Sequence, residues 1–227
     1  MVTVAAPPRL ARRRVRALHR RLERSYGPAK KQRLAPLDEL MLTILSQSTS
    51  DANRDRAYEA LRARFPDWDA VRRAARAEVE NTIRPAGLWR QKAKVLQETL
   101  HALVEERGEL DLSHLDELSD EEVVEYLTSF RGVGVKTAAC VLCFSMGRSY
   151  MPVDTHVHRV SRRLGLIPAR ATAEQAHVIL NHDSSVPPEL RFSFHIQLIR
   201  HGRAVCRAGR PACDECVLED LCPKVGL

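Results

Sequence analysis

Lys136 is the side chain in this 227-residue sequence whose position most needs a chemical explanation. It follows a glycine turn in the stretch RGVGVKTAACVL, and it would stand in the first turn of the helix that this stretch predicts. A helix N-terminus carries partial positive charge and disfavours a cation. By default, a lysine beside such a turn is one more contact for a phosphate group.

The glycine turn predicts a hairpin of two helices. The sequence EYLTSF-RGVG-VKTAACVLCF reads as a helix, a four-residue turn and a second helix. Gly132 and Gly134 allow positive φ and a close approach of the backbone. The N–H groups of the turn would then face outward, in front of the second helix, which is a geometry that binds phosphate. A G-x-G turn alone is weak evidence for such a site.

Four cysteines near the end of the sequence predict a metal centre. Cys206, Cys213, Cys216 and Cys222 have the spacing C-x6-C-x2-C-x5-C within seventeen residues, so one centre could gather all four thiolates. A structural zinc site usually has two close ligand pairs, and only one close pair is present here. An iron–sulfur cubane also takes four cysteines and tolerates wider, unequal loops. Both metals stay open at this point, and cysteines without a metal are the least favoured reading.

The other two cysteines predict no chemistry. Cys140 and Cys143 stand three residues apart in the helix that follows Lys136, among alanine, valine and leucine, so we expect buried apolar side chains rather than a redox pair. Arginines interrupt any apolar segment that could serve as a secretory signal. We therefore expect the cytoplasm or the nucleoid, where clustered cysteines are metal ligands more often than disulfides.

The first 33 residues carry most of the positive charge. They contain eleven Lys or Arg and one acid, which gives +10, whereas the whole chain has +7 and the rest therefore −3. A basic end on a near-neutral body predicts a polyanionic partner, with nucleic acid first. An organelle-targeting leader is the alternative. The favoured interpretation is a folded first helix, whose apolar residues have helical spacing: Val15, Leu18, Leu22 and Tyr26.

Helical periodicity recurs along the chain, and strand signals are nearly absent. Apolar residues repeat at helical offsets in LDELMLTILSQ and in RQKAKVLQETLHALVEE. No apolar run approaches the roughly 20 residues that a membrane helix needs. We predict an all-α protein of about ten helices. Three helix starts carry N-terminal capping signals: Asp51 as an N-cap, and capping boxes at Ser119 with Glu122 and at Thr172 with Gln175.

One further motif makes the pattern specific. Asp154, in VDTHVHRV, follows Lys136 by eighteen residues and could simply cap the helix that opens at Thr155. With GVGVKTA, GLWRQKA and the cysteine loop, however, the chain resembles endonuclease III. This family is the bifunctional DNA glycosylase of the helix–hairpin–helix superfamily with an iron–sulfur cluster. The motifs occur in the same order and at matching intervals, from about Arg12 to Cys222.

The resemblance implies a fold, a cofactor and a partner. Two closely packed helical domains are expected: a six-helix barrel with the helix–hairpin–helix at 29–149, and an iron–sulfur cluster domain from 1–28 and 150–227, with the active-site cleft between them. The four cysteines would hold a structural 4Fe-4S cluster, and their loop would present Arg207 and Arg210 to DNA phosphates. The partner would be double-stranded DNA with damaged bases or abasic sites, bound by a monomeric enzyme.

The resemblance also assigns the catalytic roles, with Lys136 as the nucleophile and Asp154 as its carboxylate. A cleft that excludes water penalises the lysine ammonium and makes the free amine available, which would explain the unusual position of Lys136. The implied reaction extrudes an oxidised pyrimidine from the duplex, joins the sugar to the lysine as a Schiff base and cleaves the strand by β-elimination. The sequence does not rank the damaged bases, since pocket shape decides between them.

The chain departs from the family at several positions. Family members fill the gap left by the extruded base with side chains from two loops. Leu88 in GLW would be one such wedge, and a core residue at a helix boundary is the equal alternative. Gln47 and Ser48 in LSQSTSD stand where the family commonly has alanine and glutamine, so their contact with the orphan base is open. Thr128 occupies a position that is often acidic in relatives. Arg131 replaces the usual proline.

Three other functions compete with this interpretation. A monofunctional adenine–mismatch glycosylase would lack Lys136 and carry an extra C-terminal domain, whereas this sequence ends five residues after Cys222. A non-catalytic DNA-binding paralogue would fit the altered LSQSTSD loop and Thr128. A ferredoxin-like electron carrier would leave the hairpin and the basic first helix without a purpose, and the cysteine spacing differs from that of bacterial ferredoxins.

Overall fold

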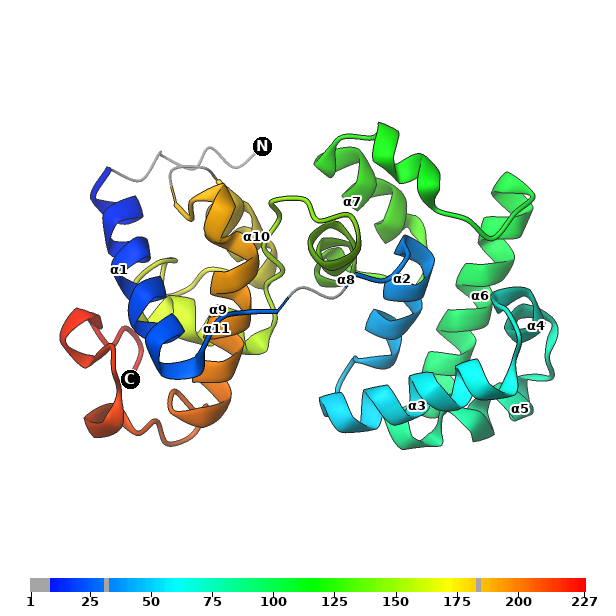
Figure 1. Cartoon of the computed structure of the whole chain (residues 1–227), viewed down its shortest axis with the longest axis horizontal. Coiled ribbons are helices and arrows are strands. Elements are labelled where there is room, and N and C mark those ends of the chain that lie inside the picture. Colours follow the sequence, from blue (N-terminus) through cyan, green and yellow to red (C-terminus); the bar gives the residue numbers. More distant parts are fainter. Residues whose placement is uncertain (1–8, 31–32, 183–184) are drawn as a thin grey trace. The chain divides into compact units, whose positions relative to one another are not determined.

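The described part of the chain is helical throughout. The computed structural model describes residues 9–30, 33–182 and 185–227, and these contain eleven α-helices, six shorter helical turns and no β-strand (Figure 1). The all-α prediction is therefore confirmed. The chain divides into two compact units, Arg33–Gly147 and Met1–Gln32 with Arg148–Leu227. No helix of the described ranges is long and apolar enough to cross a membrane.

The unit Arg33–Gly147 is organised around its longest helix, α6 (Trp89–Arg107). Helices α2, α4 and α5 all pack against α6, and α2 also packs against α8. Apolar side chains with no exposed surface fill the space between these helices: Leu40, Met41, Ile44, Leu96 and Leu100. The other elements are α2 (Pro36–Leu45), α3 (Asp51–Arg64), α4 (Trp68–Arg73), α5 (Arg76–Thr82), η1 (Arg84–Ala86), η2 (Ser113–Glu117), α7 (Asp120–Ser129), α8 (Val135–Cys140) and η3 (Val141–Ser145).

The second unit joins the two ends of the chain. Helix α1 (Arg9–Tyr26) packs against α11 (Arg191–Ala204), which in turn packs against α9 (Thr155–Arg163). Val15, Leu18 and Leu22 are buried in this core, and Tyr26 packs at its edge, so the predicted first helix is confirmed. The remaining elements are α10 (Ala173–Asn181), η4 (Pro188–Leu190), η5 (Cys213–Glu215) and η6 (Glu219–Leu221).

The capping signals are confirmed at two helices and wrong at a third. Ser119 caps α7 and Thr172 caps α10, each in a complete capping box. At α3, however, the N-cap is Ser50, whose side chain accepts a hydrogen bond from the backbone N–H of Asn53. Asp51, the predicted cap, is instead the first helical residue. Its carboxylate there still complements the positive helix N-terminus.

The helix that follows the glycine turn changes its winding after one and a half turns. Helix α8 is six residues long, and it continues directly into η3, which is a π-helical turn. Cys140 and Cys143 stand at this junction and are only 3% and 4% exposed, which confirms the prediction of buried thiols that form no disulfide. A π-helical turn widens a helix locally and re-aims its side chains, and such turns are frequent at functional sites.

The two glycines of the hairpin differ in backbone conformation and in the space available for a side chain. Gly132 has φ +85, and a Cβ built on it would lie 2.7 Å from a methyl carbon of Val95 on α6. Only glycine fits there. Gly134 is the N-cap of α8 with φ −104, and a Cβ on it would meet no atom within 4 Å. Both glycines allow positive φ, and only Gly132 adopts it, whereas the backbone of Gly134 faces open space.

These two glycines give a matched pair of stability variants. Gly132→Ala combines a left-handed backbone with a steric clash, so it should lower the free energy of unfolding by about 1–3 kcal/mol. Gly134→Ala has ordinary φ and free space, and its effect should stay within about 0.5 kcal/mol. Urea unfolding of both variants measures the difference. Equal effects would mean that the hairpin does not pack on α6 as closely as described.

Candidate active site

The hairpin holds Lys136 close to its turn. Helices α7 and α8 pack side by side (Figure 1), and the turn between them is closed by a hydrogen bond from Val133 N–H to the Phe130 carbonyl. Lys136 is the second residue of α8, and its side chain is half-buried. The sequence prediction that the lysine follows the glycine turn inside the first helical turn is therefore confirmed.

A buried carboxyl group stands on α2, which packs against α8, the helix of Lys136. Glu39 is 6% exposed and accepts a hydrogen bond of 3.0 Å from the Thr43 hydroxyl. Burial raises the pKa of Glu39 to about 7, against the opposing effects of the Thr43 hydrogen bond and of the positive charges on Arg54 and Lys136. Sequence reasoning missed Glu39, because a single acid next to an apolar helix stripe looks like an ordinary surface residue.

Thr128 contributes no buried carboxyl group of the kind that Glu39 carries. Its hydroxyl donates hydrogen bonds to two carbonyls of its own helix, Val124 at 2.7 Å and Glu125 at 3.2 Å. The side chain is thus folded back along α7. The Thr128 hydroxyl is therefore engaged by carbonyls of α7.

Two exposed tips of the same unit hold unusual backbone conformations. Ser48 has φ 51 and Leu88 has φ 46, both in the left-handed region that side chains other than glycine rarely adopt. Leu88 is 53% exposed, so its interpretation as a core residue is wrong. Gln47, next to Ser48, donates a hydrogen bond of 3.3 Å from its side-chain amide to the Gly132 carbonyl. The LSQSTSD loop is therefore attached to the hairpin.

The buried side chain of Lys92 connects the two exposed tips by hydrogen bonds. Its side chain is 2% exposed, and its ammonium donates to the carbonyls of Leu45 and Ala86, both at 2.7 Å. Leu45 ends α2 and is the first residue of LSQSTSD, and Ala86 ends η1 two residues before Leu88. Burial lowers the pKa of Lys92 to about 8. No sequence signal points directly to this clamp, since a lysine in a helix is normally solvated.

Asp154 belongs to the other unit and caps α9. Its carboxylate accepts a hydrogen bond of 2.7 Å from the Val157 backbone N–H, so the structural reading of this residue is confirmed. The side chain is half-buried, not enclosed. A capping carboxylate keeps a free oxygen for a second partner, so a chemical role is compatible with the cap. Lys136 and Asp154 lie in different units of the chain, and a joint role of the two residues in catalysis is a proposal.

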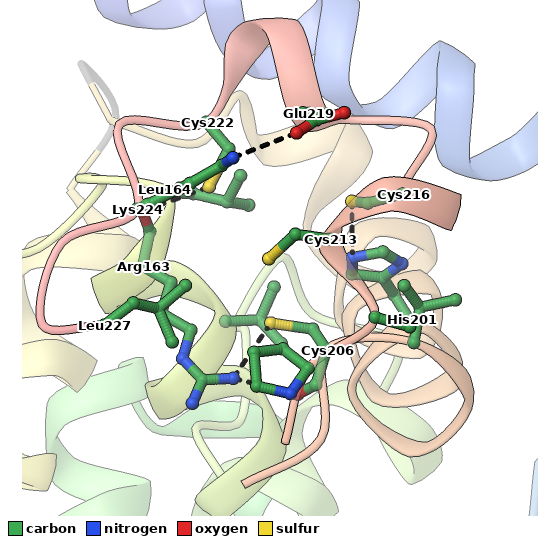
Figure 2. A pocket seen from close by; sticks show the side chains of 14 residues that line it. Arg163, Leu164, His201, Cys206, Cys213, Cys216, Glu219, Cys222, Lys224 and Leu227 are labelled. Atoms are coloured by element: carbon green, nitrogen blue, oxygen red, sulfur yellow. Dashed lines mark hydrogen bonds and ion pairs between the residues drawn. The ribbon is translucent and has the colours of Figure 1, made fainter. Parts of the chain in front are cut away.

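The four cysteines predicted as ligands line one pocket. Figure 2 shows the side chains of Cys206, Cys213, Cys216 and Cys222 around it, with Arg163 and His201 among its other lining residues. Burial, followed by smaller effects that include the neighbouring thiols, raises the pKa of Cys216 and of Cys222. Within the described ranges the four sulfurs border the pocket without forming a closed ligand set.

Polar donors face the sulfurs of this pocket. The Arg163 guanidinium donates to Cys206 Sγ at 3.3 Å, the Leu218 N–H donates to Cys216 Sγ at 3.4 Å, and His201 Nε2 lies 3.6 Å from Cys216 Sγ (Figure 2). Burial lowers the pKa of His201 to about 4, so its ring is neutral. N–H donors stabilise thiolates and tune clusters that thiolates hold. The donor set fits a cluster ligated by four cysteines.

Two arginines hold the cysteine loop in place, the buried Arg163 and the half-buried Arg159. Arg159 donates to the carbonyls of Cys206 and Gly202, and Arg163 donates to those of Cys206, Arg207 and Ala208. Arg207 and Arg210, in contrast, are exposed on the loop, as the sequence predicted. These bonds give Arg159 a structural role. Sequence reasoning missed Arg163.

A family model confirms the class to which this site belongs. Residues 41–182 match the HhH-GPD superfamily of base excision DNA repair proteins. These residues include the hairpin, Lys136, Asp154 and both exposed tips.

Similar proteins show to which family of this superfamily the chain belongs. A "Putative DNA glycosylase" of Arabidopsis thaliana is 40% identical over 195 residues, which are 84% of this chain and 65% of that protein. Endonuclease III of Synechocystis is 36% identical over 190 residues, which are 83% of this chain and 81% of the relative. The structure of a trapped endonuclease III–DNA covalent intermediate is similar with a TM-score of 0.79 and 27% identity, covering 93% of this chain and 95% of that one. The chain therefore belongs to the endonuclease III family.

The clamp residue gives the first prediction for the site. Lys92→Met keeps the volume of the side chain but leaves two buried carbonyls without their donor, at about 1–3 kcal/mol each. Removing a buried charge offsets part of this loss. We expect a net decrease of about 1–3 kcal/mol in the free energy of unfolding, measured by urea denaturation.

The matched control for this variant is Lys94→Met on the same helix. Lys94 is 48% exposed and forms a surface ion pair with Glu98 at 3.7 Å. Such pairs contribute little, so the control should change stability by less than about 0.5 kcal/mol. A Lys92→Met protein as stable as the control would show that the two carbonyls are hydrated and that Lys92 is no clamp.

Proposed function

We propose that this protein is a bifunctional DNA glycosylase and abasic-site lyase of base excision repair that removes oxidised pyrimidines from double-stranded DNA. The single observation that carries the proposal is Lys136 at the start of α8, directly after the glycine turn. A glycosylase without lyase activity needs no such amine, and a DNA-binding paralogue needs no nucleophile. The solved structure of an endonuclease III trapped covalently on DNA supports the same chemistry for a related chain.

The reaction begins with extrusion of the damaged base from the duplex. Gln47, Ser48 and Leu88, on the two exposed tips, are the residues proposed to enter the gap. The open space at Gly134 lets a DNA backbone approach the hairpin closely. Unpaired or damaged bases leave the stack at lower cost than normal pairs, which favours lesions from the start.

The chemical steps then follow at the sugar. The Lys136 amine attacks C1′, the bond between C1′ and the base breaks, and the base leaves with the bonding electrons. Ring opening gives a Schiff base between lysine and sugar, which acidifies the C2′ hydrogen. Loss of that proton expels the 3′ phosphate and nicks the strand. Asp154 stabilises the positive charge that develops on the sugar, in the role of an electrostatic partner.

A 4Fe-4S cluster on Cys206, Cys213, Cys216 and Cys222 would supply a rigid, covalently cross-linked loop rather than a redox step. The residues of this chain do the binding. Arg163 and Arg159 fix the loop backbone, and the exposed Arg207 and Arg210 contact DNA phosphates. The protein acts as a monomer, associated with the nucleoid. Because these contacts are electrostatic, part of the DNA affinity should be independent of sequence and fall with salt.

The catalytic assignment is tested with two variants. Lys136→Ala should lower both base release and borohydride trapping by at least about 10³-fold, since the nucleophile is gone, while DNA binding is retained. Asp154→Asn should reduce turnover by about 100-fold with little loss of binding, because asparagine still caps α9. Suitable substrates are duplexes with thymine glycol, dihydrouracil or an abasic site.

Lys94→Ala serves as the surface-lysine control for these assays. A trapped adduct that persists in Lys136→Ala at the wild-type level would overturn the nucleophile assignment. An adduct formed by the wild type on abasic DNA only would instead indicate a lyase that does not excise bases.

The metal centre is tested by measuring the iron and sulfide content of the purified protein. Protein purified without oxygen should contain about four iron atoms and as many sulfides per chain. Cys213→Ala should lose them together with resistance to proteolysis of the 206–222 loop. Cys143→Ala, a buried cysteine outside the pocket, should retain them. Stoichiometric zinc in place of iron in the wild type would contradict the cluster.

A further inference from the structure

The exposed side of α1 carries positive charge to which the reaction above assigns no role. Arg13, Arg20 and Arg24 are exposed, and they follow one another at intervals of seven and four residues. These intervals correspond to about two turns and about one turn of helix, so the three side chains share one side of α1. This set of three residues is the α1 arginine face.

The arginines of this face have no acidic partner in the described part of the chain. Two other arginines of the same helix do have one, since Arg16 pairs with Glu189 and Arg21 pairs with Asp220. Helix α1 therefore has two kinds of exposed arginine. One kind binds carboxylates of its own unit, and the other is free for a partner outside the protein.

A row of arginines without acids is unfavourable for the isolated protein. Arg20 and Arg24 are like charges at i and i+4, a spacing that destabilises a helix. The short helix α4 avoids this cost, because Asp69 pairs with both Arg72 and Arg73. On α1 the charges stay unneutralised, and such a surface attracts a partner that carries several negative charges.

Packing fixes the direction in which this face points within its unit. Val15, Leu18 and Leu22, on the opposite side of α1, are buried in the core. The Arg14 guanidinium donates a hydrogen bond of 2.9 Å to the Leu221 carbonyl. The apolar side of the helix is therefore occupied. A helix that lies on a membrane inserts its apolar side into the lipid, so a membrane surface does not fit this helix.

We propose that the α1 arginine face is a further phosphate-binding surface for double-stranded DNA, which contacts the backbone whether or not a base is damaged. The three arginines span about 16 Å along the helix axis. A DNA strand presents one phosphate about every 3.4 Å of its axis, so this length reaches several phosphates. Guanidinium groups match phosphate oxygens in bidentate geometry.

The inference goes beyond the proposed function, which assigns phosphate contacts to Arg207 and Arg210 on the cysteine loop. Contacts to phosphates position a protein on DNA but carry no information on the bases. The α1 arginine face therefore binds undamaged and damaged duplexes alike. It raises the affinity for undamaged DNA, on which an enzyme that searches for rare lesions spends most of its time.

The test is the salt dependence of binding to an undamaged duplex, measured by fluorescence anisotropy. The double variant Arg13→Gln with Arg20→Gln removes two phosphate contacts, and each contact contributes about 0.9 to the slope of log K against log salt concentration. The magnitude of the slope should therefore decrease by about 1.8. The rate of borohydride trapping on saturating abasic duplex should be unchanged, because the α1 arginine face takes no part in the chemistry.

The matched control is the double variant Arg16→Gln with Arg21→Gln, which has the same change in net charge on the same helix. Both of its arginines already pair with carboxylates, so the salt slope should stay close to the wild-type value. A slope that decreases equally in both double variants would show that only net charge matters. That result, or a slope unchanged in both, would overturn the proposal.

A conservative variant separates lost contacts from a disturbed helix. Arg13→Lys with Arg20→Lys keeps both positive charges and should restore the wild-type slope. A slope as low as that of the glutamine variant would contradict direct phosphate contacts. Failure of the proposed function is a separate result, because it would appear as the absence of any trapped adduct in the wild type.

Discussion

The packing of α2 against α6 and α8 is the constraint on which the candidate site of the unit Arg33–Gly147 depends. At its C-terminal end, α2 is attached to α6 through the Lys92 ammonium and to the hairpin through Gln47. Nearer its N-terminus it carries the buried Glu39. One apolar interface therefore fixes the helix of Lys136, the proposed nucleophile, and both exposed tips within one compact unit. A shift of α2 would disturb all of them together.

In the unit formed by both ends of the chain, the cysteine loop is held in position in a different way. Its cysteine loop has little regular structure, and it is held by guanidinium groups that donate to loop carbonyls as well as by the packing of Leu218 and Cys216 on the apolar core. Arg163 alone contacts three consecutive residues of the loop and one sulfur. Such bonds satisfy backbone groups that would otherwise be buried without a partner. Arg207 and Arg210 remain exposed. Two arginines therefore hold the loop backbone, and two others face the solvent.

Local signals were the ones that sequence reasoning read correctly. Helical periodicity, the capping boxes at Ser119 and Thr172, and the burial of Val15, Leu18 and Leu22 depend on neighbours within one or two turns. The cap of α3 was misplaced by one residue because serine and aspartate are nearly equal at that position. Two glycines of the turn allow positive φ, and only the fold decides that Gly132 is the one that adopts it. Leu88 could have been core or surface, and its 53% exposure settles that question.

The sequence by itself determined the helical class, the order of the motifs and the candidate reactive groups: an amine after a glycine turn, a capping carboxylate and four spaced thiols. These follow from residue type and short-range spacing, which do not depend on how helices meet. Only the tertiary structure decided that Glu39, Lys92 and Arg163 matter, since each is charged and would be solvated on an isolated helix. Their burial arises from the packing of segments far apart in the chain, and that packing makes Lys92 a clamp between two loops, Arg163 an anchor of the cysteine loop and Glu39 a buried acid.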